Sequence, residues 1–426
     1  KEGLIKVGRG KETLVLKKPY ENYLESDTFK KRILSLIDLS HSLRLFSPAI
    51  NLQGMYHMDL EKELENPLPE NNRIEQWRTQ YRLFDNSLSA LGNQTLHGLY
   101  HDINAFVESA FLDIFHVSFT EEEEKTYLNR LVNDYRTCLE NCKNGKMAEA
   151  KKGLEALTDP FHITAEQYLA TLPADRTIQE NFSWSPQKGR TRYCDMIAID
   201  LVRKINDGTH PAGTLLPNGA ILANIYHVSP ITIRRTIALL NKLGVAKTVN
   251  GVGTRVVSTE NTHLSVSLKA IILGNNLRTF LEAYQLFAMT SEPFISYSFP
   301  HFPEELTDKL RQAATIAEPN IAISAITATC LQGIVRYCPL ASIREITSKL
   351  TLLLLNGSAI PHAELTIDWN RSSKELAEAL DAKNGHLFAC LFSRILNKTF
   401  ATMKTHLKKM GVKNIDRIAQ PVMNDC

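Results

Sequence analysis

The stretch from residue 192 to residue 257 constrains the fold most strongly, because it places two helical patterns and a glycine-rich hairpin around a four-residue turn. The turn is Tyr226-His227-Val228-Ser229, and Ser229 is suited to cap the helix that follows. Pro230 stands at the first position of that helix, where a missing N–H costs least. Gly244 is placed to end the helix, because glycine adopts the left-handed conformation at no steric cost. This order predicts a winged helix-turn-helix whose wing is the hairpin.

Basic residues concentrate in the same region. Between Lys188 and Ser258 there are ten Lys or Arg residues and three Asp residues, a net charge of about +7, whereas the whole chain carries +3. Such a local excess is typical of a nucleic-acid-binding module, although a solvated basic face on an ordinary helical domain is an alternative interpretation. Residues near the start of the second helix meet base edges and phosphates in helix-turn-helix proteins. The predicted DNA-binding residues of this module are Arg192, Ser229, Ile231, Thr232, Arg234, Arg235, Lys247, Thr254 and Arg255.

Several short motifs follow one another at fixed spacing here. They are the loop Gly208 to Pro217, Leu222-Ala223, Val228-Ser229, Ile233-Arg234, Leu239-Leu240, Gly244 and the run Gly251 to Val256. In these residues the chain resembles the GntR family of bacterial transcription regulators. The resemblance implies a DNA-binding transcription regulator that binds a double-stranded operator and is controlled by a small-molecule effector in a helical domain.

The chain departs from the family pattern at two places. It has Asn218-Gly219-Ala220 where the family usually has Ser-Glu-Arg, and Pro230 where the family usually has Arg. The missing arginines motivate a second hypothesis, a sensor or interaction protein whose winged helices mediate protein contacts rather than specific DNA binding.

An internal repeat is visible at the start of the chain. Gly3, Lys6, Gly10, Thr13 and Val15 match Gly244, Lys247, Gly251, Thr254 and Val256 at one offset of 241 residues, and Lys143-Asn144-Gly145 matches Lys383-Asn384-Gly385 at an offset of 240. We expect a tandem duplication, in which residues 1–20 are the remnant wing of a first winged helix with DNA contacts at Lys6, Arg9 and Lys11. Roughly 50 to 60 residues of that first module would then precede Lys1. A hairpin that merely resembles a wing is the alternative.

The rest of the chain shows helical spacing of apolar residues. We predict a helical, sensor-like domain at 21–172, a linker at 173–190, the winged helix at 191–258 and a second helical sensor-like or dimerisation domain at 259–426. The fold class is therefore mainly α, with a winged helix-turn-helix and two all-α bundles. Within the linker, Phe182 and Trp184 are expected to dock on a neighbouring domain.

Residues 21–172 also resemble the ligand domain of the FadR branch of the GntR family. The residues that carry this resemblance are Phe84, Leu88, Gly92-Asn93, Leu96, Leu99, Leu139, Gly145, Ala148, Ala150 and Leu154. Many members of that branch bind a divalent metal with an Asp and three His, but the matching positions here are Tyr81, Asp85, Tyr135 and Thr158 (or Leu157). His97, His101 and Asp102 form another cluster on one helix face, which is more often a surface or core feature than a ligand set. We therefore predict no metal and no other cofactor.

The remaining partners follow from charge, composition and the family pattern. An organic-acid-like effector would find anion partners in Arg44, Arg78, Arg82 or Arg136, and the assembly would be either a homodimer or a pseudo-dimer within one chain. No phosphate loop, nucleophile elbow or paired-carboxylate motif indicates an enzyme. The seven cysteines are odd in number and lack the regular spacing of a disulfide framework, which suits a protein of the reducing cytoplasm. We expect no membrane partner, because the chain has no signal peptide and no apolar run of about 18 residues.

Overall fold

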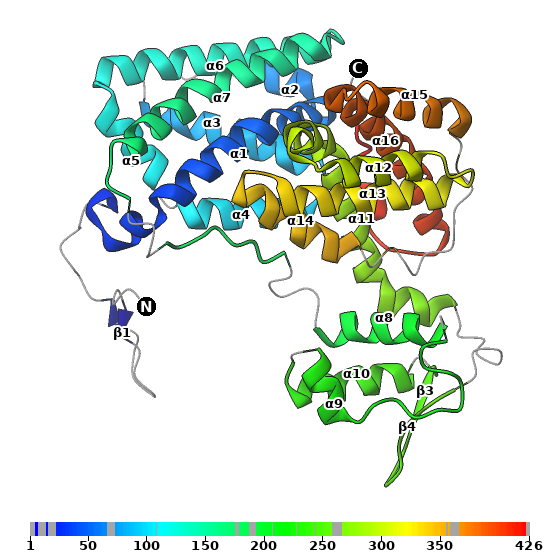
Figure 1. The fold of residues 1–426 in the computed structure, drawn as a ribbon. Coiled ribbons are helices and arrows are strands. Elements are labelled where there is room, and N and C mark those ends of the chain that lie inside the picture. Colours follow the sequence, from blue (N-terminus) through cyan, green and yellow to red (C-terminus); the bar gives the residue numbers. More distant parts are fainter. Residues whose placement is uncertain are drawn as a thin grey trace.

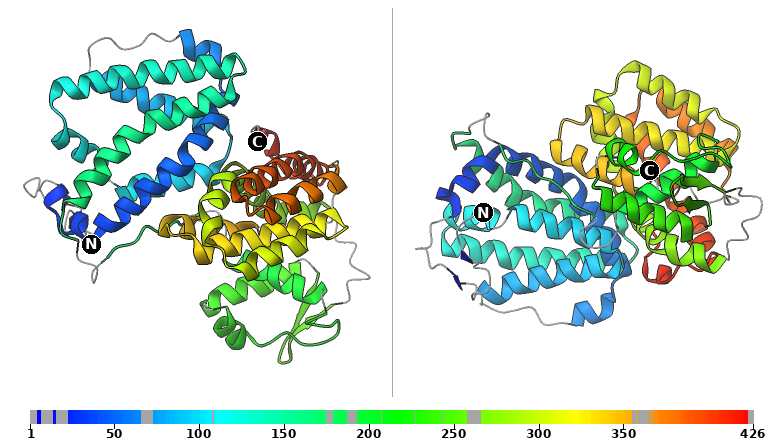
Figure 2. Two further views of the ribbon diagram at one scale, coloured as in Figure 1. Left: turned by 45° about the horizontal axis from the view of Figure 1, so that its top comes forward. Right: turned by 90° about the horizontal axis from the view of Figure 1, so that it is seen from below.

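The protein consists almost entirely of helices, and the prediction of a mainly α fold with a winged helix is confirmed. The computed structural model describes residues 5–6, 14–15, 23–65, 73–107, 109–174, 179–186, 193–206, 208–226, 228–242, 244–257, 266–354, 357, 365 and 367–422. A body of two helical groups carries a smaller globule, which lies beside the second group (Figures 1 and 2). We call α1 to α7 the first helical half and α11 to α16 the second helical half.

The first helical half opens with the short 3-10 helix η1 (Tyr23–Glu25). Its α-helices are α1 (Asp27–His57), α2 (Leu60–Glu65), α3 (Arg73–Ala90), α4 (Gln94–Val107), α5 (Ala110–Ser118), α6 (Glu121–Lys143) and α7 (Met147–Ala170). Thr120 and Glu123 form a reciprocal capping box at the start of α6. The hydrogen bonds from Thr120 hold the pKa of the Glu123 carboxyl below its usual range. Such caps satisfy the N–H groups that a helix start leaves without intrahelical partners.

The second helical half, in its described residues, has one α-helix fewer than the first. Its helices are α11 (Val266–Ser298), η3 (Phe299–His301), α12 (Glu304–Ala314), α13 (Pro319–Tyr337), α14 (Ala341–Leu354), α15 (Trp369–Asp381), α16 (Gly385–Lys409) and η5 (Ile415–Arg417). Side chains cap α15 and α16 as well, since Asp368 accepts a hydrogen bond from Arg371 N and Asn384 accepts one from Leu387 N. None of the described helices combines the length and low charge that crossing a membrane requires.

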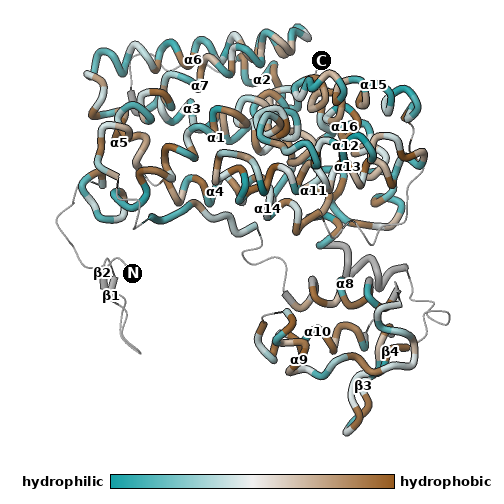
Figure 3. The backbone as a smooth tube through the Cα atoms, viewed as in Figure 1, coloured by the Kyte–Doolittle hydropathy of each residue, from teal (hydrophilic) through white to brown (hydrophobic). Residues whose placement is uncertain are grey.

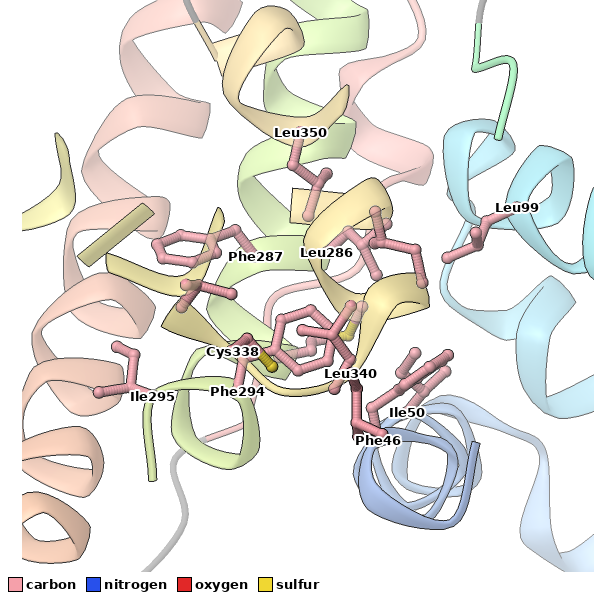
Figure 4. Close-up of a cluster of buried hydrophobic side chains, with 14 of the residues drawn as sticks. Phe46, Ile50, Leu99, Leu286, Phe287, Phe294, Ile295, Cys338, Leu340 and Leu350 are labelled. Atoms are coloured by element: carbon pink, nitrogen blue, oxygen red, sulfur yellow. The ribbon is translucent and has the colours of Figure 1, made fainter. Parts of the chain in front are cut away.

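One large hydrophobic core runs through both halves, and each half also has a smaller cluster of its own. Figure 4 shows its centre, where Phe46 and Ile50 of α1 face Phe294 of α11 and Leu340. The rings of Phe46 and Phe294 meet edge to face with centroids 5.7 Å apart, and both side chains are buried. Edge-to-face packing adds to the free energy gained by removing two aromatic rings from water. The apolar stripes of the two halves therefore cover each other. In Figure 3, hydrophobic and hydrophilic residues alternate along the helices of both halves.

Two buried or half-buried carboxylates connect the halves in a reciprocal way. Asp38 of α1 accepts hydrogen bonds from Ala341 N (2.6 Å) and Ser342 N (2.7 Å) at the start of α14. Glu282 of α11 accepts hydrogen bonds from Thr95 N (3.1 Å) and Thr95 Oγ1 (2.7 Å) at the start of α4. In each case the first helix of one half caps the fourth described α-helix of the other half, where the helix dipole favours negative charge. Each half thus supplies a carboxylate to the start of one helix in the other half.

An extended segment after each half continues this reciprocity. The strap, residues 179–186, follows α7 and reaches the second half, where Glu345 of α14 accepts hydrogen bonds from Trp184 N (3.0 Å) and Ser183 Oγ (3.2 Å). Phe182 packs against Phe106 of the first half, with ring centroids 5.7 Å apart. Because Phe182 and Trp184 are both buried, the expectation that they dock on neighbouring helices is confirmed.

The second extended segment is the tail, residues 415–422, which follows α16 and reaches the first half. Ala419 N donates to Leu91 O (3.0 Å), and Gln53 of α1 bonds to the backbone of Val422 in both directions. The tail comes very close to the backbone of the first half at Gly92, where an added Cβ atom would stand 1.7 Å from Arg417 O. Strap and tail therefore both fasten the two halves together.

The two short sequence repeats, at offsets of 241 and 240 residues, differ in how well they agree with the structure. Ile5 pairs with Val15 between β1 (Ile5–Lys6) and β2 (Leu14–Val15), and Ala246 pairs with Val256 between β3 (Ala246–Val249) and β4 (Gly253–Val256), so the register agrees at an offset of 241. The Lys-Asn-Gly echo is not in register. The left-handed residue is Gly145 (φ 73°) between α6 and α7 but Lys383 (φ 52°) between α15 and α16, 238 positions later. The left-handed residue marks the same point in each turn, so the two turns correspond at an offset of 238 residues. The sequence match at an offset of 240 is therefore two residues out of register with the structure.

Candidate nucleic-acid interface

The globule at residues 193–257 is built from three helices and a hairpin. Helix α8 (Tyr193–Asn206) leads to α9 (Gly219–Ile225), α10 (Pro230–Lys242) and the strands β3 and β4. Its own hydrophobic core is separate from that of the helical body and consists of Ile197, Ala198, Leu201, Ile205, Leu216, Leu222, Ala223, Ile233, Leu240, Val245, Ala246 and Val256. The sequence expectations for its boundaries are confirmed, since Ser229 Oγ accepts a hydrogen bond from Thr232 N (3.3 Å) and Gly244 is left-handed at φ 70°.

The glycine-containing loop before α9 pairs with β4 of the wing through an isolated bridge between Leu215 and Arg255. Leu216 N donates to Thr254 O and Val256 N donates to Thr214 O, each at 2.8 Å, so the loop lies along β4. Gly213, with φ 84°, turns the chain into this pairing, a conformation that costs glycine little. The loop motif thus fixes where the wing stands relative to α9 and α10.

Helix α10 presents its predicted contact residues on one exposed face. Arg234 and Arg235 are both exposed, and neither makes an ion pair with a carboxylate in the part of the chain that the structure describes. Ile231 is 57% exposed. The hydroxyls of Ser229 and Thr232 are hydrogen bonded to each other (3.0 Å) and serve the helix cap. The opposite face of α10 is buried in the core, so the arginine face points away from the domain.

The wing contributes the other predicted residues. Lys247 on β3 is exposed, whereas Thr254 on β4 is half-buried and lies 3.3 Å from the Thr248 hydroxyl. Arg255 is exposed and donates to Gly213 O at 2.9 Å, which ties it to the loop. Of the remaining predictions, Arg192, Arg9 and Lys11 lie outside the described residues, and for Lys6 the structure describes only its backbone place in β1.

One positioning residue escaped the sequence reasoning. Asn241, near the end of α10, accepts a hydrogen bond from Thr248 N (3.0 Å) and donates one to Thr248 Oγ1 (2.8 Å). These two bonds fix the wing to α10. The available signal was a lone amide directly after Leu239-Leu240, since a polar residue at the end of an apolar run usually has a hydrogen-bonding role.

Each of the four arginines considered as anion partners lies beside at least one carboxylate of the chain. Arg44 pairs with Asp159 and Glu166, Arg78 with Glu75, and Arg82 with Glu63. Arg136 donates to Leu64 O and lies 3.6 Å from Glu140. Each guanidinium therefore has a carboxylate neighbour in this structure, and the expectation that one of the four binds an anionic effector stays a prediction.

Two of the four metal positions implied by the resemblance, Tyr135 and Tyr81, differ in exposure. Tyr135 is buried and donates to Leu83 O (3.1 Å), while Tyr81 is 60% exposed. Asp102 accepts a hydrogen bond from Ser185 N (2.9 Å) and thereby holds the strap. Among the described residues, no group of three or more His, Cys, Asp or Glu side chains is arranged to hold a metal ion.

The three helices, the turn between α9 and α10 and the wing define a winged helix-turn-helix domain. The family model described as bacterial regulatory proteins of the gntR family matches residues 194–256, so this part of the chain is a GntR family domain. It has the fold of GntR transcription regulators.

Three solved structures are similar to parts of the chain. A GntR protein of Streptococcus agalactiae has 14% identity over 49% of this chain and 99% of its own, with a TM-score of 0.23. A GntR family transcriptional regulator from Pseudomonas syringae pv. tomato has 16% identity over 52% and 89%, with a TM-score of 0.21. Lar, which controls the agr system of Listeria monocytogenes, has 14% identity over 51% and 98%, with a TM-score of 0.19. No curated protein matches the chain.

Proposed function

We propose that this chain is a DNA-binding transcription regulator whose winged helix binds an operator through α10 and the wing. The observation that carries the proposal is the outer face of α10, where Arg234 and Arg235 are exposed at the positions that meet DNA in helix-turn-helix proteins. Lys247 and Arg255 extend the positive charge to the wing. Arginine reads guanine and pairs with phosphate, so the face suits double-stranded DNA.

We further propose that the chain is a tandem duplication that acts as a pseudo-dimer. Three observations support this: the shared register of the two hairpins, the reciprocal carboxylate caps of Asp38 and Glu282, and the crossing of strap and tail. Dimeric regulators place one winged helix on each half-site, and two linked modules achieve this within a single chain. Sedimentation of the full chain should give the mass of one chain at micromolar concentration, and a dimeric mass would contradict the pseudo-dimer.

A small-molecule effector has a candidate site between the halves. A cavity of about 330 Å³ is lined by Ser35 and Asp38 of α1, Asn181 and Phe182 of the strap, and Arg344 and Glu345 of α14. This volume suits a small ligand, and the strap leads directly toward α8. The proposal is tested by screening small organic acids for a change in DNA affinity. Ser348 also lines this cavity, so Ser348→Trp should fill it and abolish the response. A response unchanged in that variant would place the effector elsewhere.

Replacing Arg234 and Arg235 together by alanine should weaken binding of the full chain to its selected duplex by about 100-fold, because two charged contacts are lost. The slope of log affinity against log salt should also fall by about 2. Fluorescence anisotropy over a salt series measures both quantities. The matched control is the double variant Arg130→Ala and Arg371→Ala, which removes the same charge from exposed sites on the helical halves. Equal losses in both variants would show that net charge alone is responsible.

The alternative function, protein contact through the winged helix, is favoured by a specific feature of α9. Ile221 and Ile225 are 48% and 53% exposed and stand four residues apart on one helix face. The salt series separates the two functions: a DNA regulator loses affinity steeply as salt rises, whereas a protein-contact module would show no salt-dependent binding to any duplex.

A further inference from the structure

The DNA-facing surface of α10 is unusual in its chemistry. The helix contains no Asp, Glu or Gln, and its one Asn is Asn241. Both polar ends of the Asn241 amide are used by Thr248 in the wing. Carboxylates and amides are the groups that read cytosine and adenine in the major groove. Helix α10 therefore has no free side chain for either base.

The first turn of α10 offers little hydrogen bonding either. Pro230 has no N–H to give, and the hydroxyls of Ser229 and Thr232 bond to each other while Ser229 also caps the helix. What projects from this turn is the side chain of Ile231, which is 57% exposed. Arg234 and Arg235 follow one turn later and supply the charge that attracts the phosphate backbone.

An exposed isoleucine at the start of a recognition helix has one partner among the base edges. Only thymine presents an apolar group, the C5 methyl, to the major groove. We propose that Ile231 reads a thymine methyl, so that the half-site bound by this winged helix carries a T·A pair under the first turn of α10. The inference rests on the proposed function, since it assigns a base preference to the same DNA-binding face.

The proposed contact is apolar. Binding should therefore weaken when the thymine methyl is removed, even though every hydrogen bond of the base is kept. Burial of one methyl against Ile231 corresponds to about a fourfold change in affinity. Deoxyuridine differs from thymidine only in lacking this methyl and keeps the same base pairing. Replacing thymines one at a time by deoxyuridine therefore isolates the proposed contact without any change to the protein.

The experiment uses the full chain and a duplex that it selects from a random-sequence library. We expect one thymine at which deoxyuridine weakens binding about fourfold, and we expect Ile231→Ala to bind thymine and deoxyuridine duplexes equally at that position. Ile225→Ala is the matched control, because Ile225 is exposed to a similar extent, 53%, at the far end of α9. That control should retain the fourfold difference.

Two other outcomes would overturn the inference, and they are distinguishable. If the library yields no enriched duplex, the proposed function itself fails and the base preference fails with it. If a duplex is selected but no thymine responds, or the response persists in Ile231→Ala, the regulator stands and the role of Ile231 is wrong.

Discussion

Replacing Gly92 by alanine is expected to lower the free energy of unfolding by about 4–8 kcal/mol. Gly92 has φ 62°, a left-handed conformation in which a side chain costs about 1–2 kcal/mol. The larger effect is steric, because the new Cβ would stand 1.7 Å from the backbone oxygen of Arg417. The tail would have to move, which would expose the buried Ile415 and Ile418, each worth about 1.5–3 kcal/mol. Urea unfolding of the full chain measures the loss.

Gly145→Ala is the matched control for this variant. Gly145 has a similar backbone, φ 73°, but open space around the position of a Cβ atom. It should therefore lose only the conformational part, about 1–2 kcal/mol. Limited proteolysis gives a second readout, since only Gly92→Ala should make the tail accessible. Equal destabilisation by the two substitutions would mean that the contact between Gly92 and the tail contributes nothing.

Replacing Glu282 by alanine is expected to cost about 3–5 kcal/mol, the range for removing one partner of a buried charged network. The side chain is 2% exposed and accepts three hydrogen bonds, from Thr95 N, Thr95 Oγ1 and Arg278 Nε, the last at 3.0 Å. Its loss leaves Thr95 N and Thr95 Oγ1 without this acceptor at the junction of the two halves, although Asn93 still accepts a hydrogen bond from Leu96 N at the start of α4. Chemical denaturation of the full chain, followed by circular dichroism, measures the effect.

Glu305→Ala is the control, because Glu305 also pairs with a basic residue on its own helix but is exposed. Exposed ion pairs contribute little, so its unfolding midpoint should equal that of the unaltered chain. A midpoint for Glu282→Ala within error of the control would refute the structural role assigned to the reciprocal cap.

The winged helix could be predicted nearly in full from the sequence, because its signals are local. Ser229, Pro230 and Gly244 act within one helical turn of their own positions, and the glycines of the wing fix their own backbone. The helical character of the two halves followed in the same way from apolar spacing. Even the register of the first hairpin agreed with the echo of 241 residues.

The sequence predicted which residues belong to the candidate site, but it did not predict the contacts that arrange those residues in space. The sequence identified Ile231, Arg234 and Arg235 on the recognition helix, yet the pairing of Asn241 with Thr248 required the wing to be in place. The same holds for Arg44, whose partners lie 115 and 122 residues away on α7. Charge alone made Arg44 a candidate partner for an anion, and only the tertiary structure shows that two carboxylates already lie beside it.

By itself, then, the sequence determined the identity of the winged helix and the helical nature of both halves, because helix caps, left-handed glycines and apolar periodicity act over a few residues. Only the tertiary structure decided how the halves join. Glu282 caps a helix 187 residues earlier in the chain, and Asp38 caps one 304 residues later. Nothing local distinguishes these carboxylates from surface ones. Their role arises because packing the apolar faces together places them beside backbone N–H groups at the starts of helices in the other half.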